Sequence, residues 1–169
     1  MANNSNYIKG KKIHLRNGTY TLYTSNNIKA QFVTDGNDVT LNGIVNIDSS
    51  ELYFSGIKFN LTQFNISNSK VSFNNCTINY TGTSTLNIIL NSDVLFKNCI
   101  ADNMSSYFNI TDSNVKMDFS SISRTGSQQL VAAGTGTILF IISKTTILTS
   151  NINRNTNAVV LFGGYVNAT

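Results

Sequence analysis

The sequence is short of charge and lacks several residue types that mark specialised sites. Charged residues make up 12% of the 169 residues, about half of the roughly 25% that is usual. Proline and tryptophan are absent, and there are only two cysteines, one histidine and eight acidic residues. The net charge of +4 is scattered apart from Lys9, Lys11 and Lys12. This distribution argues against a nucleic-acid partner.

Long apolar runs are also missing. No stretch of about 18 apolar residues occurs, so we predict no membrane span. Residues 1–10 lack the apolar core of a signal peptide. We predict that they form an N-terminal extension and that residues 11–169 form a single domain. Either the chain acts where it is made, or it is a segment of a longer protein.

Neutral polar residues take the place of the missing charge. Asparagine, serine and threonine together make up well over a third of the chain, and glutamate occurs once, at Glu51. Asn, Ser and Thr compete with helical hydrogen bonds and favour turns and strands. Isoleucine, valine, phenylalanine and tyrosine are plentiful, which favours β-strands. The composition therefore predicts an all-β protein with no substantial helix.

Three segments align on the pattern Asx-Ser-x-Val-x-Phe-x-Asn-Cys; the third keeps Asx-Ser-x-Val and has Met117 at the phenylalanine position. They are residues 68–76, 91–99 and 112–120, and the pattern decays in the third. Valine and phenylalanine alternate with polar residues, which places them on one face of a strand. The Asx-Ser pair before each strand is typical of a tight turn in the left-handed region.

A period of about 22 residues with short strands and no helix is typical of one coil of a β-solenoid. We predict a single parallel β-helix of about seven coils over residues 11–169. Coils stack at about 4.8 Å, so equivalent residues should form buried columns. The predicted columns are Leu52, Val71, Val94, Val115, Ile138 and Phe54, Phe73, Phe96, Met117, Phe140. A β-sandwich, the main competing fold, would not require this recurrence.

The repeat extends outward with less fidelity. Upstream, Val39 and Leu41 match the valine and phenylalanine positions, and downstream Val160 and Phe162 match them. We also predict a second short strand in most coils. The residues that mark it are Phe64 and Ile66, Leu86 and Ile88, Phe108 and Ile110, and Leu130 and Val131.

Two further columns follow from the same alignment. Cys76 and Cys99 share one position, which Ser120 and Ser143 continue. Parallel neighbours have unfavourable disulfide geometry, so we expect two buried free thiols. The position before each strand holds Glu51, Lys70 and Asp93. Stacking would then alternate acid, base and acid, and we interpret these charges as structural.

Candidates for catalysis are few. A glycoside hydrolase needs two carboxylates facing one cleft, and Asp112 and Asp118, on either side of a strand, are the candidates if the protein is an enzyme. Asp35 and Asp38 are also close, but they lie in a sequence typical of a turn. His14 alternates with apolar neighbours, so we expect a solvent-facing strand residue. No residues for a cofactor or a metal ion are predicted.

The strands at residues 71–78 and 94–100, and Ile13-His14-Leu15-Arg16-Asn17-Gly18-Thr19-Tyr20 near the start, resemble coils of the pectate-lyase-like β-helix superfamily. Similar coils occur in phage tail spikes and fibres and in surface adhesins with polymorphic-membrane-protein-like repeats. The resemblance implies right-handed winding. It carries no catalytic residue over to this chain, because the acid clusters of the lyases and spike hydrolases have no clear match.

These features lead to a functional expectation. Scarce acids and abundant neutral polar side chains favour a non-catalytic structural or adhesive protein, exposed outside the cell on a virion or a cell surface. A glycan receptor is the expected partner. The ends offer no capping helix, so we expect a homotrimer or continuation into a longer chain. The alternative is a polysaccharide-degrading lyase or glycoside hydrolase with a cleft on the β-helix face.

Overall fold

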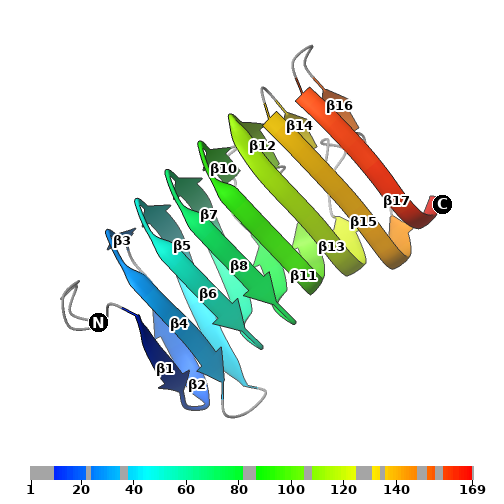
Figure 1. Ribbon diagram of the computed structural model, residues 1–169. Coiled ribbons are helices and arrows are strands. Elements are labelled where there is room, and N and C mark those ends of the chain that lie inside the picture. Colours follow the sequence, from blue (N-terminus) through cyan, green and yellow to red (C-terminus); the bar gives the residue numbers. More distant parts are fainter. Residues whose placement is uncertain are drawn as a thin grey trace.

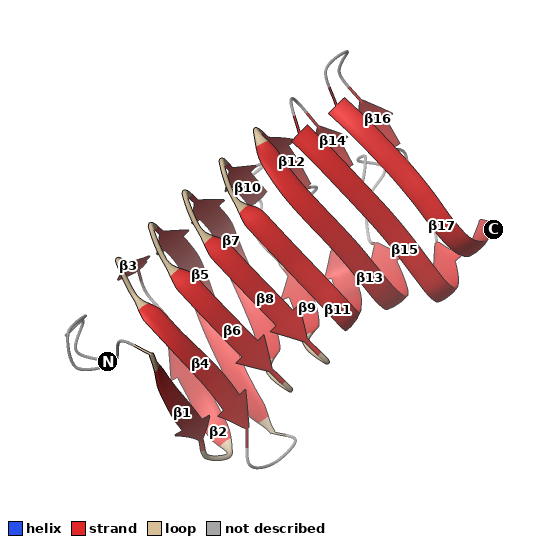
Figure 2. Cartoon of the chain, viewed as in Figure 1, coloured by secondary structure: helices blue, strands red, loops and turns tan. Residues whose placement is uncertain are grey.

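The computed structural model is a β-solenoid, and every regular element that it describes is a strand (Figures 1 and 2). The structure describes residues 10–21, 24–34, 38–81, 87–104, 108–124, 131–133, 136–147, 152–154 and 158–168. The predicted extension therefore lies almost wholly outside the described residues. The all-β class predicted from composition is confirmed.

The strands stack in three parallel ladders, which together form one continuous sheet. Ladder 1 contains β1 (Lys11–Leu15), β4 (Lys29–Thr34), β6 (Glu51–Ser55), β8 (Lys70–Asn74) and the first parts of β11 (Asp93–Met104), β13 (Ser113–Arg124), β15 (Gly136–Ile147) and β17 (Ala158–Ala168). Ladder 2 contains β2 (Gly18–Thr21), the first parts of β5 (Val39–Asp48) and β7 (Lys58–Ser67), β9 (Thr77–Tyr80) and the later parts of β11, β13, β15 and β17. Ladder 3 contains β3 (Thr24–Asn26), the later parts of β5 and β7, β10 (Asn87–Leu90), β12 (Phe108–Thr111), β14 (Val131–Ala133) and β16 (Ile152–Arg154).

Each coil visits ladder 1, ladder 2 and ladder 3 in turn, and the coils stack from the N-terminal to the C-terminal end (Figure 1). Residues 29–111 make about four such coils. We expected about seven coils over the whole chain. The strands described before residue 29 and after residue 111 extend the same ladders at both ends.

The predicted columns form the ladder-1 part of the core. Phe54, Phe73 and Phe96 lie one above another in ladder 1 and are fully buried. Their rings are nearly parallel, with centroids 5.3 Å apart for Phe54 and Phe73 and 4.9 Å apart for Phe73 and Phe96. The column of Leu52, Val71, Val94 and Val115 is also buried. The predicted register between the aligned strands is therefore confirmed.

The upstream extension of these columns was wrong. Val39 and Leu41 lie in ladder 2, where Leu41 pairs with Phe59. The residues that stand before Leu52 and Phe54 are Ala30 and Phe32. Alanine replaces the branched residue there, which hides the match in the sequence, while the Phe32 ring continues the stack at 5.3 Å from Phe54.

The strand predicted around Leu86 and Ile88 is shifted by one residue relative to the prediction. Ile89, not Ile88, lies between Ile66 and Ile110 in ladder 3, and it is fully buried. Ile88 pairs with Asn65 instead. Because the side-chain period of a strand is two, a shift of one residue exchanges the two faces. Leu86 and Leu130 lie outside the described residues.

The corner between ladder 3 and ladder 1 carries the predicted left-handed residue in each described coil. The φ angles are close to +50° at Asn27, Ser49, Asn68, Asn91 and Asp112. Asparagine and aspartate tolerate this region because their short side chains bond locally. The recurring Asx-Ser pair therefore marks where the chain turns into ladder 1.

A buried serine follows four of these five corner residues, and these serines form an internal hydrogen-bonded ladder. Ser69 is typical. Its Oγ–H donates to the carbonyl of Ser67 at 2.5 Å, and its Oγ accepts the backbone N–H of Ser50 at 3.0 Å. The ladder contains Ser50, Ser69, Ser92 and Ser113. It satisfies backbone N–H groups that the turn removes from the sheet.

The two cysteines lie at the corner between ladder 1 and ladder 2. Cys76 and Cys99 are buried free thiols, as predicted. Their thiol–thiol hydrogen bond, together with burial, raises the pKa of Cys76, so it remains protonated. Ser120 does not continue this column. Phe119 pairs with Cys99 because β13 runs through the corner without a counterpart of the left-handed Asn98.

The prediction that Ser143 continues the cysteine column was wrong for the same reason. Ile142, rather than Ser143, pairs with Phe119. Once β13 omits one corner residue, the following strand keeps its shortened register. The decay of the repeat after Val115 is therefore a change in the corner and leaves the ladder-1 pairing intact.

Candidate functional site

The outer face of ladder 1 presents three columns of side chains, and the last of them, at the ends of the strands, holds Val33, Ser55, Asn74 and Lys97. The other two columns border the depressions on this face. The charged column is formed by Lys29, Glu51, Lys70, Asp93 and Asn114. The central column, two residues further along each strand, is formed by Gln31, Tyr53, Ser72, Leu95 and Lys116. The residues between the two columns point into the core. Alternation along each strand thus fixes both columns on one face.

The charged column alternates in sign as predicted, and it begins one coil earlier than the sequence analysis placed it. Lys29 forms an ion pair with Glu51, with Nζ 2.6 Å from Oε2. This hydrogen bond from Lys29 lowers the pKa of Glu51, and the charge of Lys70 lowers it further. At the other end of the column, Asn114 Nδ2 donates to Asp93 Oδ1 at 3.0 Å.

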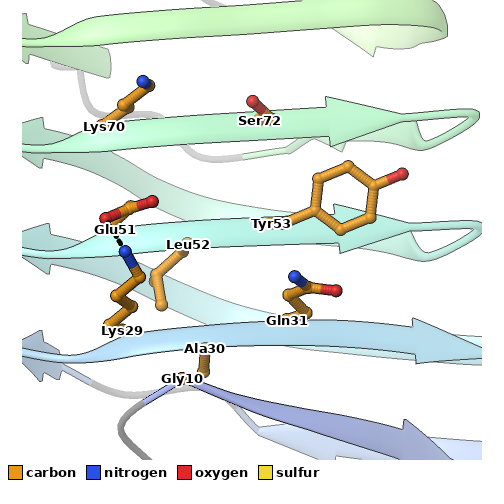
Figure 3. Close-up of a pocket in the computed structure, with 9 residues that line it drawn as sticks. All are labelled: Gly10, Lys29, Ala30, Gln31, Glu51, Leu52, Tyr53, Lys70 and Ser72. Carbon is orange, nitrogen blue, oxygen red and sulfur yellow. Dashed lines mark hydrogen bonds and ion pairs between the residues drawn. The ribbon is translucent and has the colours of Figure 1, made fainter.

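Three shallow depressions lie on or beside this face, and Lys70 borders all of them. The first, of about 320 Å³, is bordered by Gln31, Glu51, Tyr53 and Ser72 among others (Figure 3). The second, of about 290 Å³, lies over Ser72 and Leu95 and reaches Lys116 and Asn114. The third, of about 420 Å³, follows the corner residues Asn68, Asn91 and Asp112.

Tyr53 is the one aromatic side chain among the residues that border these depressions. Its ring lies along β6, with a face turned toward the viewer in Figure 3. The ring is half-buried. Asn74 Nδ2 donates to the Tyr53 hydroxyl at 3.1 Å, which fixes the far end of the ring. Ser72, its neighbour on β8, is small and leaves space above that strand.

The structure does not bring the predicted pair Asp112 and Asp118 together. Asp112 is exposed at the corner before β13, whereas Asp118 lies toward the far end of the ladder-1 part of β13. Six residues of extended chain span roughly 20 Å. Glycoside hydrolases hold their two carboxyl groups roughly 5–10 Å apart.

Asp112 instead shares the third depression with Asp93. Sequence reasoning assigned Asp93 to a structural column and missed this proximity. The sequence did contain a signal for this proximity. In each aligned repeat the Asx residue lies at the corner just before the strand that carries the charged column. Stacking therefore places Asp112 beside the coil that carries Asp93.

The remaining candidates have ordinary roles. His14 is an exposed strand residue, as predicted. Asp38 lies 3.6 Å from Lys58 Nζ, and Asp35 is outside the described residues. Within the described part of the chain, no group of three or more His, Cys, Asp or Glu side chains is placed to hold a metal ion.

Comparisons with known proteins leave the fold as the basis for the functional argument. No protein-family model, curated protein or solved structure matches the chain. Among the residues that the structure describes, no helix is long and apolar enough to cross a membrane. The strand pairings show a parallel β-solenoid.

Proposed function

We propose that this protein is a non-catalytic structural or adhesive β-helix that binds glycan on the outer face of ladder 1. In this proposal it is displayed on a virion, as a tail spike, fibre or capsid component, or on a cell surface. The resemblance of its coils to the right-handed pectate-lyase-like superfamily supports that setting. A homotrimer could bury apolar side chains that the single chain exposes, such as Ile44, Leu90 and Ile100.

The observation that carries the proposal is the Tyr53 depression. An exposed ring face offers a flat apolar platform, and the side chains of Gln31, Glu51, Lys70 and Ser72 offer hydrogen-bonding groups around it. Ligand sites typically combine an apolar surface with a few polar groups that orient the ligand. Sugars have both an apolar C–H face and hydroxyl groups, so their chemistry matches this surface.

The proposal that the protein is not catalytic rests on the arrangement of its carboxylates. Asp112 and Asp118 are too far apart for paired acid–base chemistry. Glu51 is engaged by Lys29, and its lowered pKa suits a permanent anion rather than a proton donor. General acid catalysis by a carboxylate needs a raised pKa.

The rival function, degradation of a polysaccharide, is favoured by one observation. Asp93 and Asp112 border the same depression. If they form a catalytic pair, replacing either with asparagine abolishes turnover without changing the melting temperature.

A glycan array combined with depolymerisation assays tests the proposal. We expect the purified chain to bind at least one glycan class and the Tyr53→Ala variant to bind it much more weakly. Release of reducing ends or unsaturated products from any polysaccharide at a useful rate would refute the non-catalytic claim. Light scattering gives the solution mass, for which the trimer is expected.

A further inference from the structure

We infer that the glycan bound by ladder 1 is a neutral, linear oligosaccharide that runs along the solenoid axis, across the strands, with about one sugar unit per coil. The inference rests on the proposed function and specifies its ligand. Three observations carry it: the continuity of the groove, its charge balance and the single aromatic platform.

The first two depressions form one groove. Both are bordered by Lys70 and Ser72, so they meet over β8. Together they cross five strands, from Lys29 on β4 to Lys116 on β13. At about 4.8 Å per coil, the four steps span roughly 19 Å. This length suits a chain of several sugars and exceeds what a monosaccharide needs.

The groove repeats with the period of the coils. Each strand contributes one residue of the charged column and one of the central column. The spacing between strands, about 4.8 Å, is close to the length of one pyranose unit in an extended glycan. A linear glycan that lies across the strands can therefore meet an equivalent pair of positions in each coil.

The charges favour a neutral ligand. Along the charged column, Lys29 and Lys70 alternate with Glu51 and Asp93. Lys116, at the end of the central column, adds one positive charge, so the three lysines and two carboxylates of the groove sum to only +1. A glycan with an anionic group on each sugar would place charge beside both carboxylates and be repelled there. A hydroxyl group can accept from an ammonium group and donate to a carboxylate. The hydroxyl groups of neutral sugars can thus form hydrogen bonds with both the lysines and the carboxylates of the charged column.

Lys70 is the residue most available to such a ligand. It lies between Glu51 and Asp93 in the column, and it borders both halves of the groove. Lys29, by contrast, already donates to Glu51. We therefore assign Lys70 as the central donor and Tyr53 as the stacking platform in the adjacent coil.

The test uses neutral and acidic oligosaccharide series of increasing length, immobilised on an array and then measured by titration calorimetry. The neutral probes are linear glucan, mannan, xylan and galactan oligomers, and the acidic probes are oligogalacturonates and heparin fragments. We expect affinity for one neutral series to rise with length up to about four or five units and then level off, because the groove crosses five strands. Raising the salt concentration should barely change it.

Variants locate the site. Tyr53→Ala and Lys70→Met should each weaken binding roughly tenfold, which corresponds to about 1.4 kcal/mol. Tyr53→Phe keeps the ring and should retain most of the affinity. Lys58→Met is the matched control, because Lys58 is an exposed lysine on ladder 2. Melting curves show that each variant is folded.

The possible failures are distinguishable. Preference for the acidic series, or affinity that does not depend on length, would overturn this inference while glycan binding on ladder 1 stands. Binding that Tyr53→Ala and Lys70→Met leave unchanged would place the glycan elsewhere, and it would overturn both this inference and the proposed ladder-1 site. Absence of binding to every glycan on the array would overturn the proposed function as well.

Discussion

At the scale of single residues, the ring column is the feature on which stability depends most. Phe73 is fully buried and stacks on Phe54 and Phe96, and it also contacts Phe59 edge to face at 5.5 Å between centroids. Removing a buried phenylalanine costs both transfer free energy and the cavity that it leaves. A solenoid concentrates such residues in columns, so one truncation affects the coils on both sides.

We expect Phe73→Ala to lower the free energy of unfolding by about 3–5 kcal/mol. Ser72→Ala, one residue earlier on the outer face of the same strand, should change it by less than about 0.5 kcal/mol. Urea denaturation followed by circular dichroism measures both. Equal effects of the two substitutions would show that Phe73 is not in the core.

Asp48 gives a prediction about pH. Its carboxylate accepts hydrogen bonds from Ser67, Asn68 and Ser49, and these lower its pKa below the ordinary 3.8. A lowered pKa in the folded state stabilises the fold at pH values above 3.8, and this contribution disappears as the pH falls through the folded-state pKa.

The Asp48→Asn variant should therefore melt below the parent at neutral pH, and the difference should shrink as the pH falls below about 3.8. Melting temperatures across that range measure it. Asp38→Asn, at a highly exposed aspartate, serves as the control. A difference between Asp48→Asn and the parent that does not change with pH would contradict this role for the Asp48 carboxylate.

At the scale of elements, the corners determine where each strand begins. Gly56, Asn75 and Asn98 occupy successive coils at the corner after ladder 1, all with positive φ. A positive φ costs asparagine little free energy and glycine none, whereas it costs other residues about 1–2 kcal/mol. The glycine in the first of these coils indicates that this corner position requires a positive φ.

Asn75→Ala should accordingly destabilise the fold by about 1 kcal/mol, and Asn75→Gly should be nearly neutral. Both variants lose the hydrogen bond from Asn98 Nδ2 to Asn75 Oδ1, so their difference isolates the backbone term. Chemical denaturation of the two variants compares them directly. Equal stability of the two would contradict the assignment of strain to φ.

The serine ladder gives a second prediction for a corner. Ser69→Ala removes the acceptor for the buried Ser50 N–H, which has no replacement within the turn. An unsatisfied buried donor costs about 1–3 kcal/mol. Denaturation should show that loss, and hydrogen exchange should show faster exchange at the Ser50 amide. Unchanged exchange there would contradict the ladder.

Sequence reasoning predicted those parts of the fold in which side-chain type repeats. The columns through Val71 and Phe73 could be aligned because each coil keeps the same residue class there. Reasoning failed at Ala30, where a small residue replaces a branched one, and at Phe119, where a corner residue is omitted. Corner lengths depend on backbone conformation, which a pattern of apolar residues does not record.

The candidate site was harder to predict than the core. The sequence analysis identified Glu51, Lys70 and Asp93 as one column and missed the central column beside it, which holds Tyr53, although the predicted register already implies that column. The depression beside the Tyr53 ring depends on side-chain conformations, which the repeat pattern does not record. The search for paired acids also pointed to Asp112 with Asp118, which proximity along the chain suggested and the extended strand keeps apart.

At the scale of the whole molecule, the stacked register connects stability with function. The same pairing that buries the phenylalanine rings places Lys29, Glu51, Lys70 and Asp93 in line on the surface. A solenoid thereby converts a repeated sequence position into a linear array of side chains. Such an array is suited to ligands that are themselves linear and periodic.

Methyl NOE spectroscopy on valine-labelled protein tests this register most directly. The parallel pairing of β8 with β11 and of β11 with β13 places Val71 beside Val94 and Val94 beside Val115. We expect strong NOEs within both pairs, because stacked residues lie about 4.8 Å apart. Absence of these NOEs, or Hα–Hα contacts of an antiparallel pairing between the same strands, would contradict the solenoid and the groove that depends on it.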